Sequence, residues 1–142
     1  MSIPFRLIVP RALVEAMVAQ AQAELPAECC GLLAGVLRDG VGRVEVRYPL
    51  VNALASPTEY LSDARSMFEA HRDMTKRSLD VLAVYHSHPA SAPIPSRKDR
   101  AQNYSEEVVN LIISLTTTPP LIRGWWLTAE SHREAEWSMS DE

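Results

Sequence analysis

Cysteine and basic residues are scarce in this sequence. Its 142 residues include only two cysteines, which are adjacent at Cys29 and Cys30. Such a pair forms neither a C-x-x-C redox motif nor a four-cysteine zinc site, and it does not make a disulfide framework. The 14 lysines and arginines are outnumbered by 18 aspartates and glutamates, so the formal net charge is −4. This balance lacks the basic surface of a nucleic-acid-binding protein.

Long apolar runs are absent as well. No segment approaches the roughly 18 apolar residues that a membrane span needs. The apolar run at residues 7–9 is stopped by Pro10 and is too short for the core of a secretory signal peptide. We therefore expect a protein of the reducing cytoplasm with free thiols, and neither nucleic acid nor a membrane as its partner.

The sequence does contain enough apolar material for a packed core. Hydrophobic residues make up 46% and charged residues 23% of the chain, which is ordinary for a soluble globular protein. We expect one domain over residues 1–142, with the last few residues as a flexible tail.

Apolar periodicity predicts helices and strands along the whole chain. Apolar residues from Leu13 to Leu25 recur at spacings of three and four, which predicts a helix ended by Pro26. Ser62 is expected to cap a second helix. The expected helices cover 13–25, 62–74 and 97–104, and the expected strands cover 30–37, 41–50, 79–88, 108–115, 121–128 and 134–137. This order predicts a mixed α/β domain with a central sheet.

Two histidines and an aspartate have the spacing of a metal site. His86 and His88 end a predicted strand, and the two-residue period puts both imidazoles on one face with Cα atoms about 6–7 Å apart. Asp99, in the first turn of the next helix, can supply a third ligand. Three protein ligands leave a fourth position for water, which is the arrangement of a catalytic zinc site.

Such a site also needs a proton acceptor, because zinc lowers the pKa of a bound water to about 7. Glu28 precedes the apolar strand that begins near Cys30, and it is the best candidate for this base. Taken singly, each feature has a structural alternative. The two histidines occur by chance, Ser96 and Asp99 form a helix-capping box, and Glu28 is a solvated turn residue.

Taken together, these residues carry a resemblance to a known family. His86-x-His88, seven residues, Ser96, two residues and Asp99, with Glu28 upstream, resemble the motif of the JAMM (MPN+) zinc metallopeptidases. The order of predicted elements resembles that family's fold over nearly the whole chain. The resemblance implies a cytidine-deaminase-like α/β/α sandwich with a mixed central sheet.

The resemblance also implies a role for each motif residue. His86, His88 and Asp99 are expected to hold one Zn²⁺. Glu28 is expected to accept the proton of the metal-bound water and to pass it to the leaving amine. Ser96 is expected to stabilise the oxyanion of the tetrahedral intermediate.

Base deamination is excluded despite the related fold, because neither candidate histidine ligand is followed by the glutamate of an H-x-E motif, and the chain has no P-C-x-x-C pair. Among the other residues, we expect Cys29 and Cys30 to pack in the interior. The second helix is expected to bury a face made of Ala64, Met67, Phe68, His71 and Met74. His132 is expected to be solvated, and Trp125 and Trp126 are expected to pack on opposite faces of a strand.

Residues 28–33 and 59–63 resemble the small bacterial members of the family. That likeness implies a deubiquitinase-like peptidase or isopeptidase acting on the Gly-Gly tail of a ubiquitin-like or sulfur-carrier protein, for example by releasing cysteine. The tail is expected to join an exposed edge of the sheet as an added strand. A non-catalytic MPN scaffold and a phage-tail-like short-peptide or cell-wall peptidase are the alternatives, and a homodimer is left open.

Overall fold

The computed structural model describes residues 4–141, which form eight strands and three helices around one sheet. The strands are β1 (Arg6–Pro10), β2 (Cys30–Arg38), β3 (Val41–Leu50), β4 (Asp80–His88), β5 (Val109–Ser114), β6 (Leu121–Leu127), β7 (His132–Glu134) and β8 (Trp137–Ser140). The helices are α1 (Arg11–Ala23), α2 (Ala64–Arg77) and α3 (Arg97–Ala101).

The eight strands form a mixed sheet in the order β7-β6-β5-β4-β2-β3-β1-β8. Strands β4 and β5 pair in parallel, whereas β4 and β2 pair antiparallel. The sheet is strongly curled, because its two edge strands β7 and β8 are separated by only Ala135 and Glu136. Strand β4, which ends in the two histidines, lies in the middle of the sheet and pairs with β2 and β5. A substrate tail expected to join an edge of the sheet therefore finds no free edge on β4 itself.

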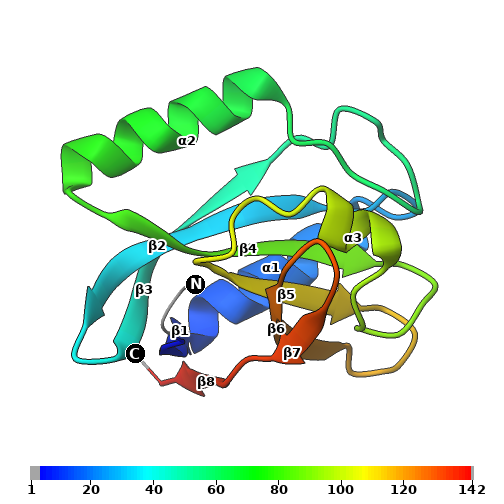
Figure 1. Ribbon diagram of the computed structural model, residues 1–142. Helices are drawn as coiled ribbons and strands as arrows, with labels where there is room; N and C mark the ends of the chain where they lie inside the picture. Colours follow the sequence, from blue (N-terminus) through cyan, green and yellow to red (C-terminus); the bar gives the residue numbers. More distant parts are fainter. Residues whose placement is uncertain (1–3, 142) are drawn as a thin grey trace.

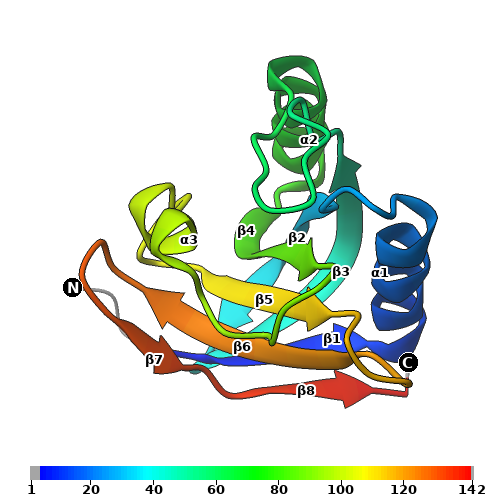
Figure 2. The same ribbon diagram turned by 90° about the vertical axis from the view of Figure 1, so that its right-hand side faces the viewer.

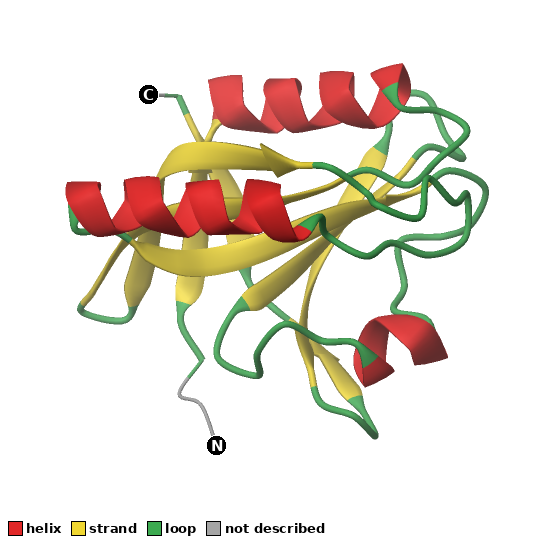
Figure 3. Cartoon of the chain, turned by 90° about the horizontal axis from the view of Figure 1, so that it is seen from above, coloured by secondary structure: helices red, strands yellow, loops and turns green. Residues whose placement is uncertain are grey.

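Helices α1 and α2 cover opposite faces of this sheet (Figures 1 and 2). Helix α1 packs through Val14, Met17 and Ala21, whose spacing places them on one side of the helix. Helix α2 packs through Ala70 and Met74 over the other face. The short helix α3 stands apart from the two long helices (Figure 3). This arrangement is the α/β/α sandwich with a mixed sheet predicted from the sequence.

Both long helices differ from the prediction at their ends. Helix α1 ends at Ala23, and Leu25 beyond it is 48% exposed. Helix α2 begins after Asp63 rather than Ser62, because the Asp63 carboxylate accepts a hydrogen bond from the Ser66 N–H at 3.0 Å. Phe68 was expected on the buried face of α2, but 67% of it is exposed.

The two ends of the described chain meet in a part of the sheet that the prediction lacked. Strand β1 pairs in parallel with β3 and β8, and its residues Leu7 and Val9 are fully buried. Where one strand over 134–137 was expected, the structure has β7 and β8. Of the residues after 137, where a flexible tail was expected, residues 138–140 belong to β8, and Glu142 lies outside the described residues. No helix within residues 4–141 is long and apolar enough to cross a membrane.

Candidate metal and catalytic site

His86 and His88 lie side by side at the end of β4. Both are buried and point to the face covered by α2 and α3, whereas Ser87 between them points to the opposite face. In the pairing of the strands, His86 lies opposite Cys30 of β2, and His88 lies beside Ser114 of β5. The central position of β4 therefore fixes the backbone of both imidazoles.

Asp99 of α3 completes a group of three metal-ligating side chains. Its carboxylate oxygens lie 3.2 Å from His86 Nε2 and 3.1 Å from His88 Nε2, and the two Nε2 atoms are 3.1 Å apart. The three candidate ligand atoms all lie within 4.8 Å of one another. The structure thus brings together the three residues expected to bind the metal.

Ser96 holds Asp99 in place from the start of α3. The Ser96 Oγ accepts a hydrogen bond from the Asp99 N–H at 3.1 Å, and the Ser96 N–H donates to the Asp99 carboxylate at 2.9 Å. This is a capping box. The alternative interpretation of Ser96 and Asp99 as a cap is therefore correct, and it coexists with the ligand geometry because each carboxylate oxygen also faces an imidazole.

The donor set fits a cation. His88 Nδ1 lies 2.8 Å from the Ala92 carbonyl oxygen, so this nitrogen carries the proton, and the Nε2 of a neutral ring presents a lone pair. The same Nε2 lies 3.1 Å from the Asp99 carboxylate, to which it donates a hydrogen bond only when it carries a proton. Although burial favours the neutral acid, hydrogen bonds from His86 and His88 hold the pKa of Asp99 well below its usual range. Two imidazoles and a carboxylate converging in this way are ligands that Zn²⁺ accepts.

Glu28 lies directly before β2 and is only 3% exposed, so its interpretation as a solvated turn residue is wrong. Its Oε1 has no hydrogen-bond partner among the described residues. Burial raises the pKa of Glu28 to about 8, against the opposing effect of the His88 charge. The negative charge of Asp99 also raises the pKa of Glu28. The base predicted from the sequence therefore lies in the same buried environment as the three ligands, with a free oxygen.

Three residues outside the predicted motif position these groups. Ser87 Oγ accepts the Cys29 N–H at 2.8 Å, which joins the residue after Glu28 to the strand that carries the histidines. The Asn52 amide donates to the carbonyl oxygens of Glu28 and Glu59. The Tyr60 ring stacks on His86 with a centroid distance of 4.8 Å. The sequence assigned neither Asn52 nor Tyr60 a role, because both positions depend on how residues 51–63 fold back on the sheet.

The cysteines and tryptophans pack as predicted. Cys29 and Cys30 are free and buried, and burial raises their pKa values to about 11 and about 12, so neither is a reactive thiolate at neutral pH. Trp125 and Trp126 are both buried in different clusters. Trp125 Nε1 donates to the Pro93 carbonyl at 2.9 Å and thereby holds the proline-rich loop that links β4 to α3.

The other two histidines lie outside the site. His71 is half-buried on α2, and its Nε2 lies 3.1 Å from the Tyr104 hydroxyl, so it is not the core histidine that was expected. His132 is exposed on β7, as predicted, and contacts the edge of the Trp125 ring.

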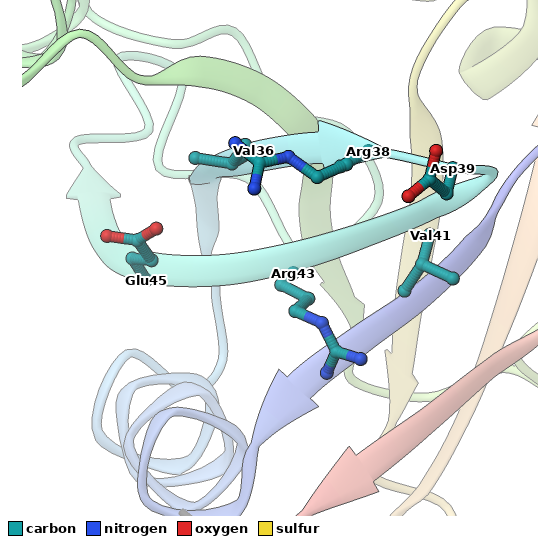
Figure 4. Close-up of a pocket in the computed structure, with 6 residues that line it drawn as sticks. All are labelled: Val36, Arg38, Asp39, Val41, Arg43 and Glu45. Carbon is teal, nitrogen blue, oxygen red and sulfur yellow. The ribbon is translucent and has the colours of Figure 1, made fainter.

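A second concave surface lies on the β2–β3 hairpin, at the end of β2 far from Glu28 (Figure 4). It is lined by Val36, Arg38, Asp39, Val41, Arg43 and Glu45. Its two acidic residues and two arginines do not form a candidate ligand group, since His86, His88 and Asp99 form the one such group among residues 4–141.

Comparison with known proteins supports the sequence resemblance. Residues 10–128 match the family model of prokaryotic homologs of the JAB domain. The chain is 40% identical over 93 residues to the CysO-cysteine peptidase of Mycobacterium tuberculosis, covering 66% of this chain and 62% of that protein. It is 33% identical over 109 residues to the desampylase of Pyrococcus furiosus, covering 76% and 74%.

Among solved structures, a solution structure of a protein from Desulfitobacterium hafniense matches with a TM-score of 0.87 and 32% identity, covering 96% of this chain and 94% of that one. The chain spans about three fifths of the length of the mycobacterial relative. The family match nevertheless covers most of the chain, including Glu28, Ser96 and the three ligand residues. The chain therefore belongs to the family of prokaryotic homologs of the JAB domain, the JAMM-type family that its histidine, serine and aspartate spacing predicted.

Proposed function

We propose that this protein is a zinc-dependent peptidase or isopeptidase that hydrolyses an amide at the Gly-Gly tail of a ubiquitin-like or sulfur-carrier protein, for example releasing cysteine. The observation that carries the proposal is the convergence of His86, His88 and Asp99 beside the buried, unpartnered Oε1 of Glu28. The names of the mycobacterial and archaeal relatives, a CysO-cysteine peptidase and a desampylase, support the substrate class.

His86 and His88 through Nε2, and Asp99 through its carboxylate, would hold the zinc ion. When bound, the ion supplies Lewis-acid activation of a water molecule and of the scissile carbonyl. Burial of the imidazoles keeps this chemistry in a medium of low dielectric constant, where electrostatic effects are strong.

Glu28 moves the proton. Its Oε1 accepts a proton from the attacking water and later returns it to the nitrogen of the leaving amine. A pKa near 8 lies close to the operating pH of a cytoplasmic enzyme, which favours a group that must both take and release a proton. The positive charge of a bound ion would lower this pKa and thereby favour the ionised base at neutral pH.

Ser96 stabilises negative charge on the substrate oxygen. Its Oγ accepts the Asp99 N–H, and a serine hydroxyl that accepts one hydrogen bond keeps its own proton for donation. The helix cap thus fixes the oxygen atom while the hydroxyl proton remains available for the developing oxyanion.

The first test is metal content and cleavage in the same preparation. The protein is purified with zinc, its metal is counted, and it is incubated with a carrier protein extended by one cysteine after Gly-Gly. Glu28→Gln should retain one zinc ion per chain and lose at least about 100-fold in kcat, the usual contribution of a general acid–base. Glu45→Gln, on the distant hairpin, is the matched control and should behave like the unaltered protein.

Three results would contradict the proposal. Unchanged turnover by Glu28→Gln would remove the base from the mechanism. Absence of bound zinc, together with absence of cleavage, would favour the non-catalytic scaffold. Cleavage of short cell-wall peptides but not of the extended carrier would favour the short-peptide peptidase.

A further inference from the structure

A small pocket lies between α2 and α3 on the face of the sheet that carries the histidines. Its floor is formed by Cys30 and Leu32 of β2 and by Val84 of β4. Met67 of α2 and Tyr104, which follows α3, also line it. In Figure 2, α2 and α3 stand on the same side of the sheet, above its central strands. The pocket therefore occupies the space between the two helices, above the central strands.

The pocket is continuous with the candidate metal site. Cys30 on its floor lies opposite His86 in the pairing of β2 and β4. Val84 precedes His86 by two residues and points to the same face. Tyr60 lines the pocket and also stacks on His86. A substrate that reaches the three ligands along β4 thus passes over this pocket.

Its size and lining suit one aliphatic side chain. The cavity has a volume of about 110 Å³ and no charged side chain in its wall. An apolar cavity of about 150 Å³ is large enough to hold benzene, so this one accepts a leucine- or valine-sized group more readily than an aromatic ring. Leu61, which is 57% exposed, forms part of the rim and remains available for contact with a partner.

The distance along the strand sets the position of that side chain in the substrate. The pocket floor centres on the pair Leu32 and Val84, about three residues before the midpoint of His86 and His88. At about 3.3 Å per residue, the pocket floor lies roughly 10 Å along the strand from the two histidines. Three residues of an extended substrate tail span the same distance. With the aliphatic side chain in the pocket, the two glycines of the tail and the scissile carbonyl that follows them would lie at the candidate metal site.

We propose that this pocket is a substrate subsite that binds one aliphatic side chain at the third or fourth residue before the scissile amide. The inference rests on the proposed function and deepens it. The preferred substrate is a carrier whose Gly-Gly tail is preceded by an aliphatic residue, and an acidic side chain at that position is rejected because no cation lines the pocket.

The test measures binding separately from cleavage. Fluorescein-labelled peptides that end in Gly-Gly, with leucine, alanine or aspartate at the third or the fourth residue from the bond to be cut, are titrated with the zinc-loaded protein by fluorescence anisotropy. At one of the two positions leucine should bind about 10-fold tighter than alanine, since several methylene groups become buried, and aspartate should bind most weakly. Equal affinities at both positions would overturn the subsite.

Two variants locate the effect in this pocket. Leu61→Asp should remove most of the preference for leucine, because it places a charge at the rim of the pocket without disturbing the core. Leu37→Asp is the matched control, since Leu37 is 50% exposed on the β2–β3 hairpin, and it should keep the preference. Loss of the preference in both variants, or in neither, would contradict the assignment.

Cleavage of the same peptides extended by cysteine separates the two proposals. Selective binding without any cleavage would leave the subsite standing and contradict the peptidase function. Cleavage with equal kcat/KM for leucine, alanine and aspartate would support the function and overturn the subsite.

Discussion

At the residue scale, Glu28 shows how the site reduces the stability of the fold. In the metal-free protein, burial raises the pKa of Glu28 to about 8 from its ordinary value of 4.5. Between these two values the folded state holds a proton that the unfolded state has released. The free energy of unfolding therefore falls as the pH rises through this window.

Replacement of Glu28 by glutamine removes this pH-dependent cost. We expect metal-free Glu28→Gln to exceed the unaltered protein in unfolding free energy by about 2 kcal/mol at pH 7. The interval from the ordinary value of 4.5 to pH 7 corresponds to about 3.4 kcal/mol at about 1.4 kcal/mol per pKa unit, and solvent screening reduces this. At pH 4 the gain should be small, because Glu28 is largely protonated in both states. Urea unfolding at the two pH values measures the difference, and a gain that is equal at both would show that the Glu28 charge is not responsible.

Residue spacing predicted that the candidate ligands converge, because their geometry is local. His86 and His88 share one strand, and the Ser96 and Asp99 cap is contained in a single helical turn. Tyr60 could not be predicted in the same way. Its contact with His86 joins residues 26 positions apart, and no periodicity in the sequence indicates it.

At the element scale, Asn52 anchors the loop before α2 to the start of β2. Its amide donates to the carbonyl oxygens of Glu28 and Glu59, and its Oδ1 accepts the N–H groups of Leu54 and Leu61. All four hydrogen-bonding positions of the side chain are thus engaged. The same loop carries Tyr60, so the anchor also holds a wall of the metal site.

Asn52→Asp tests this anchor with almost no change in shape. The carboxylate keeps the two acceptor positions and loses both donors, so it faces two carbonyl oxygens without hydrogen bonds. We expect the free energy of unfolding to fall by roughly 1–3 kcal/mol. Hydrogen exchange should accelerate at the amides of residues 53–61 while those of β1 and β8 stay protected. Faster exchange spread evenly over the sheet would instead indicate general destabilisation.

At the scale of the whole molecule, the metal site joins the centre of the sheet to its covering layer. The histidines end a central strand with partners on both sides, and Asp99 comes from α3 on the face above. Apolar periodicity predicted a mixed α/β domain with a central sheet, because the long helices and the central strands are apolar over enough residues to show their periods. The layered arrangement was implied by the family resemblance. Strands β1 and β8 escaped prediction because they are short and pair with residues at the far end of the chain.

This architecture predicts that zinc stabilises the entire fold rather than one loop. The two imidazoles and the Asp99 carboxylate face one another at the site. Zinc binding to them adds RT ln(1 + [Zn²⁺]/Kd) to the unfolding free energy, about 2.7 kcal/mol at 100 times Kd. The gain should be smaller at pH 5, because zinc binds deprotonated ligands. Although burial lowers the pKa of His88, its hydrogen bond to Asp99 raises this pKa overall, so protons compete for this imidazole. Calorimetry with and without zinc, at pH 7.5 and pH 5, measures it. Asp99→Asn lacks the carboxylate ligand and should respond weakly, whereas an equal response in that variant would show that the stabilising zinc binds elsewhere.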